Sequence, residues 1–222
     1  GPAEDLASYP RDFARDSALC EAAGVDLIFH PEPETMYQPD FCTFVDMNGL
    51  TGGLCGRSRP VHFRGVCTVV TKLFHIFAPD RAYFGQKDAQ QLAVIRRMAR
   101  DLDMDVEIIG CPIIREPDGL AKSSRNQYLN GTERQAALVL SRALGVAQAA
   151  LGEGETDCGA LRAAMTACIG AEPLARIDYA EIVDSLTLQP LQTVDRTALI
   201  ALAVYIGKTR LIDNFTWEVA RA

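Results

Sequence analysis

The stretch Arg81-Ala82-Tyr83-Phe84-Gly85-Gln86-Lys87-Asp88 decides the fold, because an apolar strand there runs into a glycine–lysine turn. The apolar pattern predicts a strand over residues 81–84 and a helix over residues 88–102. A second strand is predicted over residues 106–109. A strand, a helix and a strand of these lengths indicate a right-handed βαβ unit in a parallel sheet. Ligands bind such sheets at the carboxyl ends of the strands, which is where this turn lies.

Further elements flank this unit, and apolar periodicity bounded by turn residues marks each of them. Those ahead of it are helices over residues 12–23 and 65–78 and strands over residues 25–29 and 41–45. Those behind it are helices over residues 132–151 and 158–169 and strands over residues 178–183 and 198–205. The order predicts an α/β fold with two lobes, namely a Rossmann-like lobe with a parallel sheet (residues 1–113) and a smaller α+β lobe (residues 114–222).

Composition and charge narrow the class of protein. The chain has 222 residues, of which 48% are hydrophobic, so it can form a sizeable core. Its net charge of −7 argues against a non-specific nucleic-acid binder, which needs surplus Lys and Arg. The longest apolar run, Thr197–Ile206, is too short to cross a bilayer. The seven cysteines are irregularly spaced without a C-x-x-C pair, which favours reduced thiols in a cytoplasmic protein.

The turn from Gly85 to Asp88 suits an anionic ligand. Gly85 allows close approach of a backbone, and the helix that follows presents free N–H groups and a partial positive charge. Lys87 adds a cation for phosphate, and Asp88 is placed to cap the helix or to help hold magnesium. Taken alone, the turn fits an ordinary strand-to-helix connection with an exposed lysine equally well.

The segment Lys122-Ser123-Ser124-Arg125 carries two cations around two hydroxyl groups. Such a segment can fold over the β- and γ-phosphates of a nucleotide and neutralise charge on leaving pyrophosphate. It resembles the KMSKS loop of the class I synthetase and nucleotidyltransferase superfamily. A solvated basic loop is the alternative reading of these four residues.

Three other places offer polar groups for substrate. Three arginines and one histidine gather within eight residues, among them Arg59 and His62, and arginine can grip a carboxylate or phosphate with two hydrogen bonds. Gln90 and Gln91 stand in the first turn of the helix after Lys87, where one of the two amides would face a pocket. Asp16 lies on the first predicted helix. Surface charge and ordinary structural contacts are the alternatives for each of these residues.

Six motifs in a fixed order make the chain resemble the pantoate–β-alanine ligase family, the pantothenate synthetases. They are Tyr9-Pro10-Arg11, Arg59-Pro60-x-His62-Phe63-Arg64-Gly65-Val66, Phe84-Gly85-x-Lys87-Asp88-x-Gln90-Gln91, Pro112-x-x-Arg115, Asp118-Gly119-Leu120-Ala121-x-Ser123-Ser124-Arg125-Asn126 and Arg210-Leu211-Ile212-Asp213-Asn214. The resemblance runs over essentially all of the chain. It implies a nucleotidyltransferase-type Rossmann lobe with a smaller C-terminal lobe, in a homodimer.

The resemblance also implies a reaction with ATP and Mg²⁺. Pantoate attacks the α-phosphorus of ATP to give pantoyl adenylate and pyrophosphate. The amine of β-alanine then attacks the acyl carbon, which releases AMP and pantothenate. The implied partners are therefore the small molecules pantoate and β-alanine, with no nucleic acid and no membrane.

The family's functional residues carry over onto matching positions of this chain. The ATP-binding residues so implied are Gly85, Gln86, Lys87, Asp88, Ile114, Lys122, Ser123, Ser124 and Arg125. Those expected to stabilise charge in the transition state are Lys87, Ser123, Ser124 and Arg125. Those expected at the substrates are Gln91 for pantoate, with Arg59 and His62. Those expected near Mg²⁺ are Asp16 and Asp88. Ile114 would line the adenine pocket through its main chain.

The chain departs from the family pattern in two ways. The family usually has an aliphatic residue or methionine at Lys122, which here adds positive charge at the phosphates. In the family, a strand and a His-x-Gly-His motif precede the Glu4-Asp5-Leu6 region, whereas the 222 residues contain no His-x-Gly-His. Loss of one transition-state stabiliser typically costs on the order of 10²–10³ in rate. We therefore expect an N-terminally truncated Rossmann lobe and a polypeptide that alone is inactive or nearly so.

Two other functions stay open at this point. One is a different nucleotidyltransferase of the same superfamily, against which the Gln90–Gln91 pair and the Arg59–Gly65 motif count. The other is a non-catalytic nucleotide-binding or dimerisation fragment, which the lack of His-x-Gly-His favours. Binding of pantoate rather than a mononucleotide acceptor separates the ligase from the first alternative. Trapping of pantoyl adenylate separates it from the second.

Overall fold

The computed structural model describes residue 9 and residues 11–219, which divide between two compact units, residues 2–44 and residues 45–222. Pro10 of the first motif and the Glu4–Leu6 region lie outside the described residues. The residues predicted for ATP and for the substrates all belong to the unit of residues 45–222.

The unit of residues 2–44 contains helices α1 (Phe13–Ala22) and α2 (Pro33–Met36). Asp12 caps α1, because its Oδ1 accepts a hydrogen bond from the backbone N of Arg15 at 3.0 Å. The predicted strand over residues 25–29 is wrong, as is the one over residues 41–45, since both segments are irregular. A strand needs a neighbour for its backbone groups. Among the described residues, no strand pairs with either segment.

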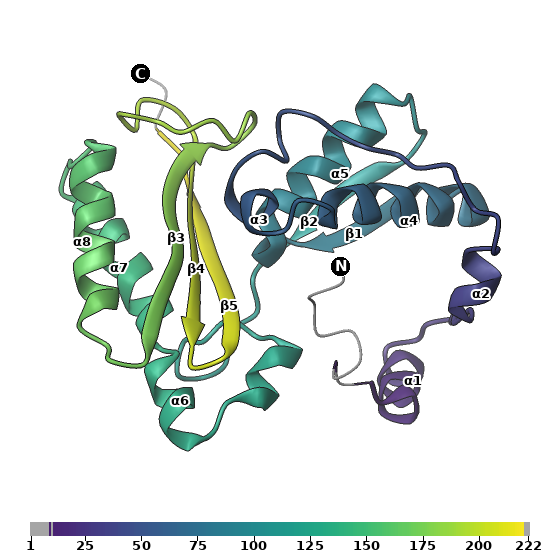
Figure 1. Cartoon of the computed structure of the whole chain (residues 1–222), viewed down its shortest axis with the longest axis horizontal. Coiled ribbons are helices and arrows are strands. Elements are labelled where there is room, and N and C mark those ends of the chain that lie inside the picture. Colours follow the sequence, from purple (N-terminus) through teal and green to yellow (C-terminus); the bar gives the residue numbers. More distant parts are fainter. Residues whose placement is uncertain (1–8, 10, 220–222) are drawn as a thin grey trace. The chain divides into compact units, whose positions relative to one another are not determined.

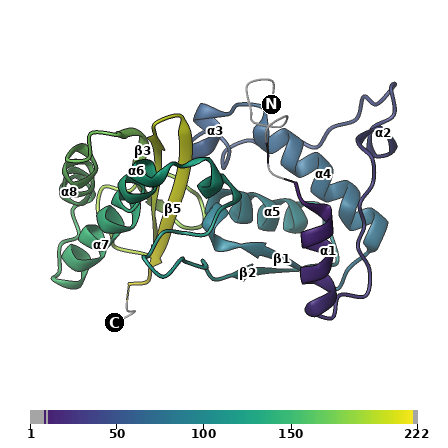
Figure 2. The same cartoon turned by 90° about the horizontal axis from the view of Figure 1, so that it is seen from below.

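The βαβ unit is confirmed in the second unit of the chain. Strands β1 (Arg81–Gly85) and β2 (Glu107–Cys111) pair in parallel, and helix α5 (Ala89–Asp101) connects them across one face of the sheet (Figure 2). The helix lies close to β2, because a Cβ added at Gly110 would lie 2.8 Å from Cδ2 of Leu92. The short 3-10 helix η1 (Gln86–Asp88) stands between β1 and α5.

Two helices precede β1 and pack beside α5. They are α3 (Leu54–Ser58) and α4 (His62–Phe77), and α4 corresponds to the predicted helix over residues 65–78. The turn before α3 is tight, since a Cβ added at Gly56 would lie 1.9 Å from the carbonyl oxygen of Thr51. Only glycine fits this close approach to a backbone.

The second sheet is antiparallel and has the order β3–β4–β5, with β3 (Ala175–Asp184), β4 (Ala198–Ile206) and β5 (Thr209–Trp217). Helices α7 (Val139–Gly152) and α8 (Cys158–Gly170) cover one face of it (Figure 1). The single helix predicted over residues 132–151 is instead α6 (Gly131–Ala136) followed by α7. The 3-10 helix η2 (Ser124–Tyr128) precedes α6.

Both faces of the antiparallel sheet are buried, each in its own apolar cluster. The first cluster lies under α7 and α8 and includes Ile200, Leu202 and Leu211. The second includes Leu199 and Ala201 of β4 together with residues of α3, α4 and α5. Residues on both sides of Ile113 thus share one core, and the division into two lobes there stays a prediction. In the part of the chain that the structure describes, no helix is long and apolar enough to cross a membrane.

Candidate active site

A small pocket lies at the carboxyl end of β1, where β1 and α5 meet the antiparallel sheet. Its enclosed volume is about 50 Å³. The predicted site residues that line it are Arg59, His62, Lys87, Asp88, Gln91, Ser123 and Arg125. These residues come from separate segments of the chain, so the fold gathers what the sequence spreads out. This position agrees with the general placement of ligands in parallel sheets.

The turn after β1 places Lys87 in the pocket, half-buried. Burial lowers the pKa of the Lys87 ammonium, whereas the carboxylates of Asp88 and Asp213 raise it and the guanidinium of Arg125 lowers it. The ammonium is therefore held in a site where its charge is poorly solvated. An anion that entered the pocket would restore favourable interactions to this charge.

The backbone of the same turn is fixed from β5. Nδ2 of Asn214 donates hydrogen bonds to the carbonyl oxygens of Gln86 at 3.1 Å and of Lys87 at 2.8 Å. Asn214 is 5% exposed, so these bonds form away from water. The position of Lys87 is consequently set by a strand far along the chain.

The segment that leads to Ser123 folds back on itself. Residues Arg115 and Ala121 form an antiparallel bridge, and the backbone N of Lys122 donates to the carbonyl oxygen of Ile114 at 2.8 Å. Gly119 in the bend has a φ of +94°, which favours glycine. Ser123 then caps η2, because its Oγ accepts a hydrogen bond from the backbone N of Arg125 at 3.3 Å.

An ion pair joins this segment to β5. Nη1 and Nη2 of Arg115 donate to Oδ2 and Oδ1 of Asp213 at 2.7 and 2.9 Å. The side chain of Asp213 is 1% exposed. Arg115 also donates from Nη1 to the carbonyl oxygen of Gly119 at 3.0 Å. Two-point pairing of this kind fixes orientation as well as distance.

Part of the pocket wall is built by Cys55, Tyr179 and Arg210. The thiol of Cys55 lies 3.3 Å from the hydroxyl of Tyr179 and 3.6 Å from Nη2 of Arg210. Burial alone would lower the pKa of Arg210, but Cys55, Asp178 and Tyr179 around it raise that pKa above its ordinary value. For Tyr179, burial raises the pKa of the hydroxyl, and the neighbouring Cys55 raises it further. At the pocket, Arg210 is thus a permanent cation and Tyr179 a neutral hydroxyl.

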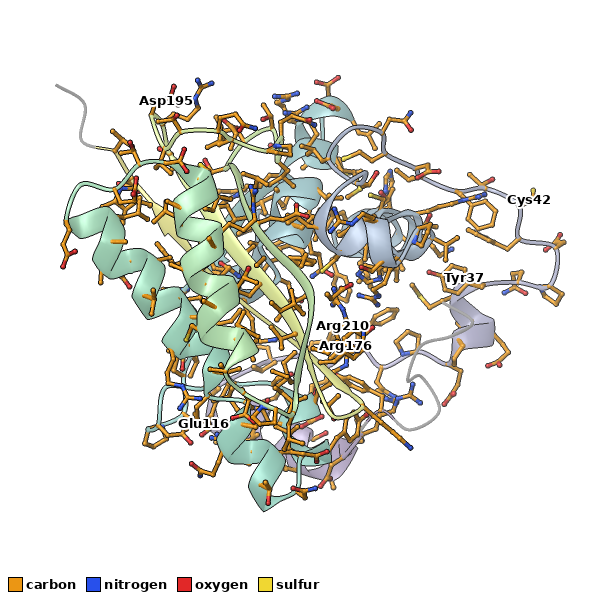
Figure 3. All side chains as sticks on the ribbon, turned by 60° about the vertical axis from the view of Figure 1, so that its left-hand side comes forward. Tyr37, Cys42, Glu116, Arg176, Asp195 and Arg210 are labelled. Carbon is orange, nitrogen blue, oxygen red and sulfur yellow. The ribbon has the colours of Figure 1, made fainter. Side chains whose placement is uncertain are left out.

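Asp178 holds the guanidinium of Arg210 in place. It accepts hydrogen bonds from Nε and Nη2 of Arg210 at 3.0 and 2.7 Å, and from the hydroxyl of Ser58 at 2.9 Å. Figure 3 shows Arg210 and Arg176 on the side of the sheet away from α7 and α8. In the strand register, Tyr205 of β4 pairs with Arg176 of β3 and with Arg210 of β5. In the sequence, Arg210 belongs to one of the six motifs but has no predicted role, and no local signal marks Cys55 or Tyr179.

The two glutamines of α5 differ in their contacts. Gln91 lines the pocket and is half-buried, as predicted for one of the pair. Gln90 also lines it, but its Nε2 donates to the carbonyl oxygens of Leu50 and Gly53, both at 2.9 Å. Gln90 therefore ties α5 to the turn ahead of α3, and this contact keeps the pocket wall in place.

Five predicted ATP residues lie outside the lining of this pocket. They are Gly85, Gln86, Ile114, Lys122 and Ser124. Four of them, all except Ser124, are exposed on the surface. Asp16 belongs to the unit of residues 2–44, where it stands in the first turn of α1. Its predicted role near Mg²⁺ stays a prediction.

Two carboxylates line the pocket, Asp88 and Asp213, and Arg115 already pairs with Asp213, so Asp88 is the one considered for a cation. Among residues 9 and 11–219, no group of three or more His, Cys, Asp or Glu side chains is arranged to hold a metal. Asp88 lines the pocket beside Lys87. Mg²⁺ is commonly held by one or two carboxylates together with substrate phosphates, so this donor set fits a cation that arrives with a nucleotide.

A second, larger groove lies on the other side of α5, with a volume of about 770 Å³. Its cationic residues are Arg96, Arg97, Arg100 and Arg115. None of the motif residues predicted to contact phosphate lines it except Gln86. It is the main competing location for an anionic ligand.

Comparison with known proteins identifies the family. The family model for pantoate-β-alanine ligase matches residues 1–216. A pantothenate synthetase of Clostridium acetobutylicum is 58% identical over 219 residues, which are 99% of this chain and 78% of the relative. Both the family resemblance and the enzyme class expected from the sequence are thereby confirmed.

Solved structures agree with the fold. The crystal structure of pantothenate synthetase from Thermus thermophilus matches with a TM-score of 0.94 and 47% identity, over 97% of this chain and 78% of that one. The pantoate-β-alanine ligase of Francisella tularensis, complexed with β-γ ATP and β-alanine, matches with a TM-score of 0.73 and 30% identity, over 97% and 73% of the two chains. The predicted α/β fold of nucleotidyltransferase type is confirmed.

Proposed function

The chain belongs to the pantoate–β-alanine ligase family, and we propose on that premise that it joins pantoate to β-alanine at the expense of ATP. In the first step, the pantoate carboxylate attacks the α-phosphorus of ATP. This step forms pantoyl adenylate and releases pyrophosphate. In the second step, the β-alanine amine attacks the acyl carbon, which forms the amide bond of pantothenate and releases AMP.

One observation carries the proposal. Lys87, Ser123 and Arg125, which come from two motifs with phosphate chemistry, line the same pocket as Gln91. Cations and hydroxyls that are already oriented stabilise the negative charge that develops as pyrophosphate leaves. We assign this role to Lys87, Ser123 and Arg125, and Ser124, which lies outside the lining, stays a predicted contact.

We place the acyl substrate beside Gln91 in the same pocket. The amide of Gln91 can accept from a pantoate hydroxyl and donate to its carboxylate. Arg59 and His62 line the same pocket and supply positive or donor groups for a carboxylate. The hydroxyl of Tyr179 and the guanidinium of Arg210 complete a wall that suits a small hydroxy acid.

The nucleotide extends beyond the pocket in this proposal. A volume of about 50 Å³ is far below the ~300–1,000 Å³ of typical small-molecule sites, so only part of the ligand fits inside. Gly85, Ile114 and Lys122 are exposed and near the pocket residues in sequence, and they are the surface on which the adenosine would lie. The charge of Lys122 would add to that of Arg125 at the phosphates.

Mg²⁺ would be held by Asp88 and by the phosphates of the bound nucleotide, and the role of Asp16 near Mg²⁺ stays a prediction. When bound, the cation would neutralise phosphate charge during attack at the α-phosphorus. The chain's own contribution is the carboxylate of Asp88 at the mouth of the pocket and the fixed cation of Lys87 beside it. A homodimer and a cytoplasmic location stay predictions.

Titration calorimetry tests this function on the chain itself. The wild-type chain is expected to bind ATP with Mg²⁺, and to bind pantoate in preference to a mononucleotide acceptor. Ser123→Ala should weaken ATP binding, whereas Thr166→Ala, at an exposed position of α8, should not. Preferential binding of a mononucleotide would favour a different nucleotidyltransferase and contradict the ligase.

Turnover by the 222 residues alone is a separate question. They contain no His-x-Gly-His, and we propose that this polypeptide releases AMP at least ~10²–10³ times more slowly than a relative that has the motif. The measurement is AMP release that depends on both pantoate and β-alanine, with a family member whose sequence contains His-x-Gly-His as the reference. Equal turnover numbers for the two proteins would contradict the proposal.

A further inference from the structure

Strand β5 sends two neighbouring polar side chains to opposite faces of the antiparallel sheet. Leu211 belongs to the apolar cluster under α7 and α8, whereas Ile212 packs with the cluster on the other face. Successive residues of a strand alternate between faces, so Asp213 lies on the same face as Leu211, and Asn214 lies on the same face as Ile212. The two residues are 2% and 5% exposed, which is unusual for polar residues unless they have partners.

Asn214 holds the phosphate turn. Both of its side-chain hydrogen bonds end on backbone carbonyls of η1, at Gln86 and Lys87. A 3-10 helix of three residues has few hydrogen bonds of its own, so these two contacts matter for its position. Asn214 thereby fixes Lys87, whose ammonium lies in the pocket.

Asp213 holds the other cationic segment. Its two carboxylate oxygens accept the two-point ion pair from Arg115, which also binds the carbonyl oxygen of Gly119. Through the bridge between Arg115 and Ala121, this contact orients the chain that enters Ser123. The backbone N of Asn214 donates to Oδ1 of Asp213 at 2.8 Å, so the two residues are linked directly.

We infer that Asp213 and Asn214 are positioning residues that hold the turn at Lys87 and the segment of residues 114–125 in register with each other. The inference rests on the proposed ATP site. Neither residue needs to touch substrate for this role. The proposed role is to keep the phosphate-binding groups of two distant segments at a fixed spacing, and the single strand β5 holds both segments.

Charge adds a second link between the two segments. The Asp213 carboxylate raises the pKa of Lys87, in opposition to burial. Asp213 thus pairs with Arg115 directly and supports the ammonium of Lys87 through space. Loss of the carboxylate would weaken both effects at once.

Hydrogen exchange followed by mass spectrometry tests the positioning role without any ligand. Asn214→Ala is expected to raise exchange about tenfold at residues 85–91, because a hydrogen bond that closes a turn is worth about one decade in its opening equilibrium. Arg115→Lys, which keeps the charge but not the two-point geometry, should raise exchange at residues 114–126. Asp213→Asn should raise it in both segments. Thr216→Ala, exposed on the same strand, is the control and should change neither.

Nucleotide affinity provides the functional readout. Asn214→Ala, Arg115→Lys and Asp213→Asn are each expected to weaken ATP binding about tenfold. At least Arg115→Lys should do so with the same midpoint of urea unfolding as Thr216→Ala. Asn214→Ala combined with Arg115→Lys should weaken binding by less than the product of the two single effects, because both break the same register.

The outcomes separate the two claims. Exchange that rises evenly along β3, β4 and β5 in all three variants, or that rises in neither segment, would overturn the positioning role. If the wild-type chain fails to bind ATP, the proposed function falls for these 222 residues. The exchange pattern still supports or overturns the positioning role in that case, since it is measured without nucleotide.

Discussion

The two sheets of the larger unit differ in how fully they are covered. Every residue of β4 except Tyr205 is buried, because apolar clusters lie on both faces of the antiparallel sheet. In β1 the residues alternate between exposed and half-buried, and Tyr83 exposes 62% of its surface. Strands of parallel sheets are usually covered on both faces. The stability of this unit therefore resides in the antiparallel sheet, and its candidate chemistry lies at the end of the less covered one.

The largest expected effect comes from a cavity in the antiparallel sheet. Ile200→Ala removes a side chain that is fully buried under α7 and α8, and should reduce the free energy of unfolding by about 2–5 kcal/mol. Tyr83→Ala on the exposed face of β1 is the matched variant and should cost less than about 1 kcal/mol. Urea unfolding followed by circular dichroism measures both. Equal losses in the two variants would show that the sheets contribute alike.

A pH effect of intermediate size belongs to Lys87. Because burial lowers its pKa, the unfolded chain binds this proton more tightly than the folded chain. The free energy of unfolding should therefore rise with pH from the lowered pKa up to about 10.4, the ordinary value for lysine. ATP affinity should fall over the same interval, since the ammonium loses its charge.

Two variants isolate this effect. Lys87→Met should remove both pH dependences and weaken ATP binding roughly 10- to 100-fold at neutral pH, as expected for a charged hydrogen-bond partner. Lys208→Met, at an exposed position in the turn between β4 and β5, should keep both dependences. A pH profile that is the same for wild type and Lys87→Met would contradict a buried ammonium at the phosphates.

The smallest effect concerns the reactivity of cysteines over the two sheets. Burial raises the pKa of Cys158 on α8, and burial with the nearby Asp46 raises the pKa of Cys67 on α4 to about 11. Cys111 at the end of β2 is only half-buried. Of these three thiols, Cys111 should be modified first by iodoacetamide at pH 8, as read by peptide mass spectrometry. Faster modification of Cys158 would mean that the antiparallel side opens more readily than the parallel side, and faster modification of Cys67 would mean that α4 opens away from α5.

Local signals predicted the βαβ unit well and β5 poorly. The strand–turn–helix pattern at residues 81–102 is carried by neighbouring residues, and its elements are found within two residues of their predicted ends. The strand β5 was missed because Asp213 and Asn214 interrupt its apolar pattern. Those two residues are buried only because Arg115 and the turn at Lys87 supply partners from far along the chain.

The opposite error occurred at residues 25–29. Val25, Leu27 and Phe29 suit a strand by composition, yet all three are exposed and irregular. Strand propensity expresses itself only where a neighbouring strand accepts the backbone hydrogen bonds. Among the described residues no such neighbour exists for this segment.

Part of the pocket could be predicted because some of its residues are neighbours in the sequence. Lys87, Asp88 and Gln91 lie close together along the chain, so spacing alone suggested that they act together. Cys55 and Tyr179 are separated by 124 positions, and nothing local to either residue marks it. Only the packing of α3 against the antiparallel sheet brings them together.

We propose that nucleotide phosphates bind between the turn after β1 and the segment at Ser123. A crystal structure of the chain with a non-hydrolysable ATP analogue and Mg²⁺ tests it most directly. We expect phosphate oxygens within hydrogen-bond distance of Nζ of Lys87 and of Oγ of Ser123. Phosphates bound instead in the larger groove, against Arg96, Arg97 and Arg100, would contradict it.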